Sequence, residues 1–223
     1  MRSQQVDFKA YVVDDGSKDA TYERILDYAA SDPRFTIYRK AVNEGPAAAR
    51  WHVLSRLKPA DDDIIVLIDL DDRLEKSALW HVEQAHTVAD VTYGSCKTAS
   101  GKYLGAPYPE EVVKEKSYRQ NKWVCFPLRT FKWKVFARCN FSADSFKYAK
   151  DVTVKGETIA KKGEWYKVCT DVAIMHPVLE QAENPKFIAH PLYFYNDIGN
   201  HIGRAKYPIE LWSETNKQIN DNR

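Results

Sequence analysis

A long hydrophobic run is missing from this sequence. The longest uninterrupted apolar stretch is Ile64 to Ile68, far short of the roughly 20 residues that a membrane-spanning helix needs. The N-terminal residues also lack the apolar stretch of a signal peptide. We therefore expect no transmembrane segment and a protein that is peripheral to a membrane at most.

Cysteine is scarce, and its spacing suggests no pairing. The 4 cysteines are scattered along the chain, at Cys96, Cys125, Cys139 and Cys169. Such spacing indicates neither a structural zinc site nor a disulfide framework. A reducing, cytoplasmic setting is the simplest interpretation.

Glycine-rich phosphate loops are absent as well. Neither G-x-x-x-x-G-K-[ST] nor G-x-G-x-x-G occurs among the 9 glycines, which argues against a P-loop enzyme and a dinucleotide-dependent dehydrogenase. The composition otherwise suits a folded domain, with 223 residues, 44% of them hydrophobic and 29% charged. A chain of this size can bury a sizeable core, so we expect a single globular domain.

Strand and helix patterns alternate along the chain. In the first half we predict strands at 10–14, 35–38 and 64–69, the last buried on both faces, with helices from Tyr22 to Ala29 and from Pro46 to Lys58. This order predicts an α/β fold with a mostly parallel central sheet flanked by helices. The second half is less regular, and there we predict a strand at 91–96, a loop at 101–109, helices at 128–138 and 168–182, and a closing strand at 186–196.

Two acidic clusters follow predicted strands. Asp14 and Asp15 end the first strand, and Asp69, Asp71 and Asp72 follow the third. Ligands of open parallel sheets bind beyond the carboxyl ends of the strands. The first cluster, which continues as Gly-Ser, also suits an ordinary turn and helix cap. Carboxylates packed as closely as in the second repel one another unless a cation lies among them, and oxygen ligands favour Mg²⁺ or Mn²⁺.

A basic, aromatic stretch lies between Lys116 and Arg138. It contains 7 Lys or Arg, no Asp or Glu, and 6 aromatic residues. Such a mixture is typical of proteins that hold single-stranded nucleic acid. It also suits a sugar acceptor stacked on an indole, an anionic carrier lipid, or an amphipathic helix that buries Leu128, Phe131 and Val135.

Several segments together resemble a known family. "VVDDGSKDAT", "NEGPAAAR" and "LIDLDD", in this order, are similar to the nucleotide-sugar half of family 2 glycosyltransferases with the GT-A fold. "LRTFKWKVF", "GEWYKVCTDVAIMHPVLEQAE" and "PLYFYND" resemble the acceptor side of one subgroup. The resemblance implies a single GT-A domain over 1–223, with a nucleotide-sugar half at 1–100, an acceptor half at 101–205 and a C-terminal tail at 206–223.

The resemblance also implies roles for individual residues. Asp14 and Asp15 would contact the base and ribose of a nucleoside-diphosphate sugar, most often a UDP-sugar, and Arg50 would face the nucleotide or its diphosphate. The D-x-D aspartates would be Asp69 and Asp71, with Asp71 the direct ligand of Mn²⁺ or Mg²⁺. Ser17, Leu70 and Asp69 complete the implied nucleotide-sugar set, and His201 is a further implied metal ligand, although a lone loop histidine is more often a surface residue.

On the acceptor side, the resemblance makes Asp171 the general base of an inverting transfer to a hydroxyl group. Without the resemblance, Asp171 is equally a helix N-terminal acid favoured by the helix dipole. Arg129 and Trp133 would lie by the acceptor, for which a cell-surface or capsular glycan is expected and a modified base in DNA is an alternative. A non-catalytic nucleotide-sugar-binding module is the other alternative. A phosphoacceptor receiver domain is disfavoured because the chain is much longer.

"RSQQVDF" resembles the end of the helix that follows the usual first strand of the family, so the resemblance predicts that this strand is missing here. Its loss would leave neighbouring strands with unpaired backbone groups, which are costly when buried. We therefore expect either that another segment or another chain, in an oligomer or from a partner, fills the gap, or that this is a truncated form that binds the nucleotide weakly.

Overall fold

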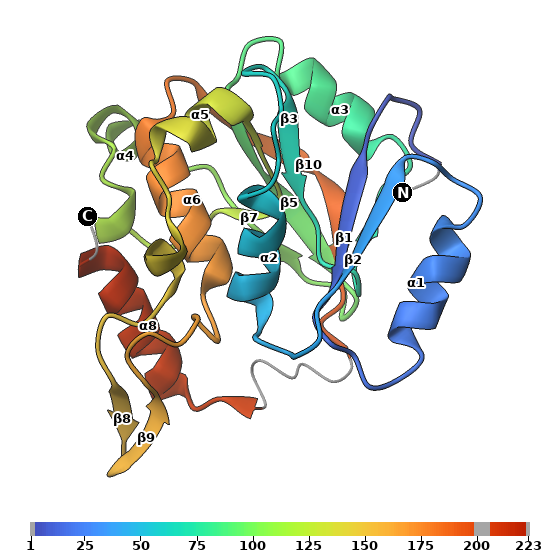
Figure 1. Cartoon of the computed structure of the whole chain (residues 1–223). Helices are drawn as coiled ribbons and strands as arrows, with labels where there is room; N and C mark the ends of the chain where they lie inside the picture. The colour runs from blue at the N-terminus through green and yellow to red at the C-terminus, as the bar shows by residue number, and fades with distance from the viewer. Residues whose placement is uncertain (1–2, 199–205, 222–223) are drawn as a thin grey trace. The chain divides into compact units, whose positions relative to one another are not determined.

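The computed structural model describes residues 3–198 and 206–221, and Figure 1 traces the chain through its helices and strands. The chain divides into two compact units, and it passes between them several times. The first unit comprises Met1–Val6, Pro59–Phe141 and Ile174–Lys206, and the second comprises Asp7–Lys58, Ser142–Ala173 and Tyr207–Arg223.

The second unit contains a two-stranded parallel sheet. Strand β1 (Ala10–Asp14) pairs with β2 (Phe35–Arg39) in continuous register, and α1 (Thr21–Ala29) connects them. Helix α2 (Pro46–Leu54) begins directly after Gly45, with proline at a position where its missing N–H costs no helical hydrogen bond. The 3₁₀ helix η2 (Ala143–Phe146), the hairpin of β8 (Val152–Val154) and β9 (Glu157–Ala160), and α8 (Ile209–Asp221) complete the unit.

The first unit is built on a mixed six-stranded sheet. Its strand order is β3 (Ile64–Leu67), β7 (Phe126–Lys132), β5 (Val91–Thr98), β10 (Pro185–Tyr195) and β4 (Arg73–Leu74), with β6 (Tyr103–Leu104) paired to β5. Helices α3 (Ala78–Ala85), α4 (Glu110–Glu115) and α5 (Trp133–Arg138) and the 3₁₀ helix η1 (Tyr118–Gln120) belong to this unit. Helix α6 (Thr170–Gln181) begins in the second unit and ends in the first.

The core of the first unit lies where α3 meets the sheet. Ala78 and Val82 of α3 pack with Cys96 of β5, Leu128 of β7, and Leu192 and Tyr193 of β10, all of them buried. Burial of such apolar side chains stabilises the unit by about 25 cal/mol for each Å² removed from water. Ile64 and Val66 of β3 also pack against this core, and the acidic cluster Asp69–Asp72 follows that strand.

The α/β architecture expected from the sequence is confirmed, and the strands and helices predicted in the first half are present. Pro177 lies inside α6, which is also present as predicted. The helix predicted over 128–138 is wrong in its first part, because residues up to Lys132 form β7 and only Trp133–Arg138 is helical. Leu128 through Phe131 are all buried. A strand that is covered on both faces lacks the alternation of polar and apolar residues by which a strand is recognised in a sequence.

The central sheet was expected to be mostly parallel, but most of its strand pairs are antiparallel. Strand β7 pairs antiparallel with both β3 and β5, and β4 and β6 pair antiparallel with their neighbours. Within the described part of this six-stranded sheet, only β5 and β10 pair in parallel. The strand hidden in the predicted helix is the one that lies between β3 and β5. The four residues Ile64–Leu67 are half-buried rather than fully covered.

Strands β1 and β3 each have one edge that no other strand covers in the described part of the chain. Strand β1 pairs with β2 alone, and β3 pairs with β7 alone. The missing first strand and a partner that supplies it both stay predictions. None of the helices within 3–198 and 206–221 is long and apolar enough to cross a membrane.

Candidate functional site

The Asp14–Ser17 turn of the second unit is held by its own side chains and by the loop after β2. Asp14, whose side chain is fully buried, accepts the Ser17 N–H at 3.3 Å and lies 3.5 Å from Arg39 Nε. Gly16 has φ +73°, and a Cβ at this position would lie 2.9 Å from Asn43 N. The turn therefore requires glycine for its backbone conformation and for the close approach of the neighbouring loop.

Asp15 organises the loop that leads into α2. Its Oδ2 accepts the Gly45 N–H at 2.6 Å, its Oδ1 accepts the Glu44 N–H at 3.3 Å, and Lys40 Nζ lies 2.9 Å from Oδ1. Lys40 also pairs with Glu44 at 2.8 Å. Burial lowers the pKa of Lys40, but hydrogen bonds to Asp15 and Glu44 outweigh it and raise that pKa overall. Both aspartates of the turn thus shape the backbone around them.

Arg50 and Asp171 come together in the same unit although they are far apart in the sequence. Arg50, on α2, donates a hydrogen bond from Nη1 to Oγ1 of Thr170, the buried first residue of α6. Asp171 is the next residue, in the first turn of α6, and it is half-buried. The sequence predicted both residues as functional, and the structure places Arg50 against the residue that precedes Asp171.

The acidic loop Asp69–Asp72 of the first unit follows β3. A turn is closed by the Asp72 N–H, which donates to the Asp69 carbonyl at 3.2 Å. Asp72 Oδ2 accepts the Tyr193 hydroxyl at 2.6 Å and its Oδ1 accepts the Asn196 N–H at 2.7 Å, while Tyr193 accepts the Asp69 N–H at 3.1 Å. Burial raises the pKa of Asp72. Leu70 and Asp71 are exposed on this loop.

The carboxylates of the acidic loop differ in their surroundings. Both oxygens of Asp72 are engaged by the protein, whereas Asp71 forms no hydrogen bond or ion pair with the described residues. Within residues 3–198 and 206–221, no group of three or more His, Cys, Asp or Glu is arranged to hold a metal ion, and the predicted ligand His201 lies outside the described residues. Asp69 and Asp71 fit the chemistry of Mg²⁺ or Mn²⁺, which commonly takes one or two carboxylates and fills its other positions with water and phosphate oxygens.

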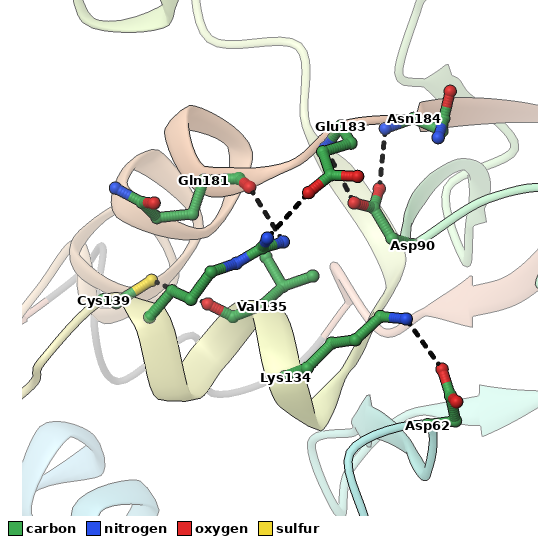
Figure 2. Close-up of polar contacts among 9 residues, drawn as sticks. Asp62, Asp90, Lys134, Val135, Cys139, Gln181, Glu183 and Asn184 are labelled. Carbon is green, nitrogen blue, oxygen red and sulfur yellow. Dashed lines mark hydrogen bonds and ion pairs between the residues drawn. The ribbon is translucent and has the colours of Figure 1, made fainter.

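Four of the seven cations of the basic stretch pair with acids of the first unit. Lys134 pairs with Asp62 at 2.9 Å, as Figure 2 shows. Arg138 pairs with Glu183 at 2.7 Å. Lys132 also pairs with Asp62, and Arg119 pairs with Glu180. The same view shows Asp90 accepting the N–H groups of Glu183 and Asn184. These hydrogen bonds hold the two residues that directly precede β10.

The aromatic residues of the same stretch belong to the interior. All six lie in the described part of the chain, and none is exposed: Tyr118, Phe131 and Phe136 are buried, and Trp123, Phe126 and Trp133 are half-buried. A stacking platform for nucleic-acid bases needs exposed rings beside free cations. The paired cations and packed rings of this stretch do not have that form.

Arg129 and Trp133, the predicted acceptor-side residues, have different surroundings. Arg129 is buried on β7, opposite Leu67 of β3, and so lies near the strand end that leads to Asp69. Its Nε donates to the Cys125 carbonyl at 2.9 Å, and its guanidinium lies 5.9 Å from the ring centroid of Trp123. Trp133 stacks on Phe136 at 5.1 Å.

Sequence reasoning missed the residues that support these loops, chiefly Tyr193, Lys40 and Thr170. Tyr193 lies in the "PLYFYND" segment, but nothing in a single sequence connects it with an aspartate 121 positions earlier. Lys40 stands four residues before Glu44, a spacing that is common for surface ion pairs and gives no sign of a third partner.

Comparisons with known proteins bear on the family and the fold of the chain. The model of the glycosyl transferase family 2 matches residues 2–142. A comparison with curated proteins finds no match. Among solved structures, residues 1–349 of S. aureus TarS align at 17% identity and TM-score 0.62, over 87% of this chain and 53% of that one. The same TarS fragment in complex with UDP-GlcNAc aligns at 15% identity and TM-score 0.60, over 92% and 55%. The chain thus spans about half the length of these TarS structures, and at such identity the likeness establishes the GT-A fold.

Proposed function

Because the chain belongs to glycosyl transferase family 2, we propose that it transfers a sugar from a UDP-sugar to a hydroxyl group of a glycan, with inversion at the anomeric carbon. The observation that carries the proposal is the family match, which spans residues 2–142 and so includes both the Asp14–Ser17 turn and the acidic loop. UDP is proposed because solved structures of the same fold include complexes of TarS with UDP-GlcNAc and with UDP.

The nucleotide half of the donor would bind at the Asp14–Ser17 turn. Asp14, Asp15 and Ser17 lie on a turn whose backbone is held by Gly16 and by the loop after β2. Arg50 would face the nucleotide or its diphosphate, with its guanidinium already oriented by Thr170. A guanidinium suits this role because its planar fork matches the geometry of phosphate oxygens.

The diphosphate would be bound through a divalent cation on the acidic loop. Asp71, with Asp69, would hold Mn²⁺ or Mg²⁺, and Leu70 would lie against the donor between them. The cation stabilises the negative charge of the departing nucleoside diphosphate when it is bound. The exposure of Asp71 and the engagement of Asp72 by Tyr193 support this division of roles.

Asp171 would act as the general base. Inverting transfer requires a group that takes the proton from the acceptor hydroxyl as that oxygen attacks the anomeric carbon. The Asp171 carboxylate stands in the first turn of α6, where the helix dipole favours a negative charge. The hydrogen bond between Arg50 and Thr170 holds the start of this helix and supports a defined position for the base.

A glycan is the proposed acceptor, with Arg129 and Trp133 on the acceptor side. A glycan is preferred to nucleic acid because four cations of the basic stretch are paired with Asp62, Glu180 and Glu183 and none of its six aromatic rings is exposed. A non-catalytic module that binds the nucleotide sugar is the competing function, and it predicts the same donor binding without turnover.

The test is a calorimetric titration with UDP, GDP and dTDP, each with and without Mn²⁺, followed by an assay for release of UDP from a UDP-sugar. We expect UDP to bind only with Mn²⁺, and UDP to be released when acceptor is added. Binding without turnover for any UDP-sugar and glycan would favour the non-catalytic module. Absence of binding by all three nucleotides would contradict the proposed function.

A further inference from the structure

We propose that Tyr193 is a positioning residue for the acidic loop Asp69–Asp72, and that its hydroxyl sets the loop conformation in which Asp69 and Asp71 present their carboxylates to a metal-bound diphosphate. This inference rests on the proposed function. It assigns Tyr193 and Asp72 to support of the loop, and it leaves Asp69 and Asp71 to bind.

The Tyr193 hydroxyl connects the two ends of the loop. It donates to Asp72 Oδ2 at 2.6 Å and accepts the Asp69 N–H at 3.1 Å. The loop is itself closed by the Asp72 N–H, which donates to the Asp69 carbonyl. One hydroxyl group thus holds both the first and the last residue of a four-residue turn, and the two residues between them project outward, where both are exposed.

The second oxygen of Asp72 ties the same loop to the end of β10. Asp72 Oδ1 accepts the Asn196 N–H at 2.7 Å. Directly after the loop, β4 pairs antiparallel with β10, with Leu74 opposite Tyr193 and Arg73 opposite Phe194. The acidic loop is therefore attached to β10 by both side-chain and backbone hydrogen bonds.

Tyr193 can act as a fixed point because its ring is packed in the core. Its exposed fraction is 1%, and it belongs to the buried cluster that contains Leu128, Cys96 and Val82. A hydrogen bond from a buried donor to a carboxylate is stronger than one between neutral groups. The position of the hydroxyl is thus set by packing, and the loop follows it.

The engagement of Asp72 separates residues that look equivalent in the sequence. In "DLDD" all three aspartates are candidate ligands, but both Asp72 oxygens accept hydrogen bonds from the protein, whereas Asp71 is exposed. Replacing Asp72 by asparagine should therefore weaken the loop, whereas replacing Asp71 removes a proposed ligand.

The test compares Tyr193→Phe with a matched control, Tyr148→Phe. Tyr148 is equally buried, at 1% exposure, and its hydroxyl likewise accepts a backbone N–H, from Lys167 at 3.2 Å, and contacts one side chain, Thr215 at 3.2 Å. Both variants remove one hydroxyl and keep the ring. We expect Tyr193→Phe alone to raise the Kd for UDP in the presence of Mn²⁺ by about tenfold or more, the effect of losing a hydrogen bond to a charged group.

A second measurement needs no nucleotide. Amide hydrogen exchange should become faster at Asp69 and Asn196 in Tyr193→Phe, and at Lys167 in Tyr148→Phe. Asp72→Asn, which keeps an acceptor for Asn196, should retain more Mn²⁺-dependent UDP binding than Asp71→Asn.

The outcomes separate this inference from the proposed function. Unchanged UDP affinity in Tyr193→Phe, or equal losses in Tyr193→Phe and Tyr148→Phe, would overturn the positioning role. A wild-type protein that binds no nucleotide would overturn the proposed function instead. The exchange comparison then still decides whether Tyr193 holds the loop, since unchanged exchange at Asp69 would exclude it.

Discussion

Arg50 of α2 donates a hydrogen bond to the hydroxyl of Thr170, the first residue of α6, across 120 positions of the sequence. The contact connects the proposed nucleotide-binding arginine with the helix that carries Asp171. If the Arg50 guanidinium both orients the start of α6 and faces the nucleotide, binding of the donor would be coupled to the position of the general base, Asp171. The two residues were predicted separately from the sequence, and their connection through Thr170 is a result of the fold.

Asp171→Asn tests the general base. The amide has nearly the same size as the carboxylate but cannot take a proton from the acceptor, so transfer should fall by about 10²–10⁴-fold. The Kd for UDP, measured by calorimetry, should stay unchanged. Asp144→Asn, which removes an exposed acid of the same unit, serves as the control and should keep full activity. An Asp171→Asn variant with wild-type turnover would exclude this base.

Asp71→Ala tests the metal site. Asp71 is exposed and forms no hydrogen bond or ion pair with the described residues, so its removal should change the free energy of unfolding by less than about 0.5 kcal/mol. Mn²⁺-dependent binding of UDP should nevertheless be lost. The control is Asp61→Ala, an exposed acid that precedes the same strand. If Asp71→Ala binds UDP with the same Mn²⁺ dependence as the wild type, another residue holds the cation.

Gly16→Ala tests the closeness of the Asp14–Ser17 turn to its neighbouring loop. Gly16 and Gly156 both have positive φ, +73° and +86°, but a Cβ would meet Asn43 N at 2.9 Å only at Gly16, and at Gly156 nothing lies within 4 Å. Gly156→Ala should therefore cost only the left-handed backbone strain, about 1–2 kcal/mol. Gly16→Ala should destabilise the protein further and weaken UDP binding. Chemical denaturation of the two variants measures the difference in the free energy of unfolding. Equal losses of stability would show that the loop containing Asn43 moves aside to accommodate the new Cβ.

His86 should make stability depend on pH. Burial lowers the pKa of His86 from 6.5 to about 4, although the Ala89 carbonyl opposes the shift. Between about pH 4 and 6.5, His86 is therefore protonated in the unfolded chain but not in the folded protein. The contribution of His86 to the free energy of unfolding is complete above about pH 6.5 and decreases as the pH falls toward 4. The loss for this one group is at most about 3 kcal/mol.

Denaturation curves between pH 4 and 7 measure this effect. His86→Gln should flatten the dependence, because glutamine cannot gain the proton, while it can still hydrogen bond near Thr130, which lies 2.7 Å from His86 Nε2. His190→Gln, at an exposed histidine, should leave the slope as it is. An unchanged slope in His86→Gln would assign the pH dependence to other groups.

Local patterns predicted most of the first half of the fold. Three of these patterns depend only on neighbours in the sequence: the apolar run before Asp14, the helical spacing from Tyr22, and the Gly45-Pro46 start of α2. They could therefore be predicted without the structure. The acidic loop was also readable, because charged residues directly after an apolar strand are unusual. Its assignment to a nucleotide sugar came from the resemblance to a family, which the match over residues 2–142 supports.

The sequence alone thus determined the α/β character of the chain, the places where its acidic residues gather and the family to which it belongs. Only the tertiary structure decided that 126–132 is a strand of a mixed sheet and that Asp72 is held by Tyr193 and Asn196. It also decided that cations of the basic stretch pair with Asp62, Glu180 and Glu183. The physical reason is the range of the interactions. Strand ends, turns and caps are set by adjacent residues, whereas burial on both faces of a strand and the partner of a charge depend on residues that only folding brings near.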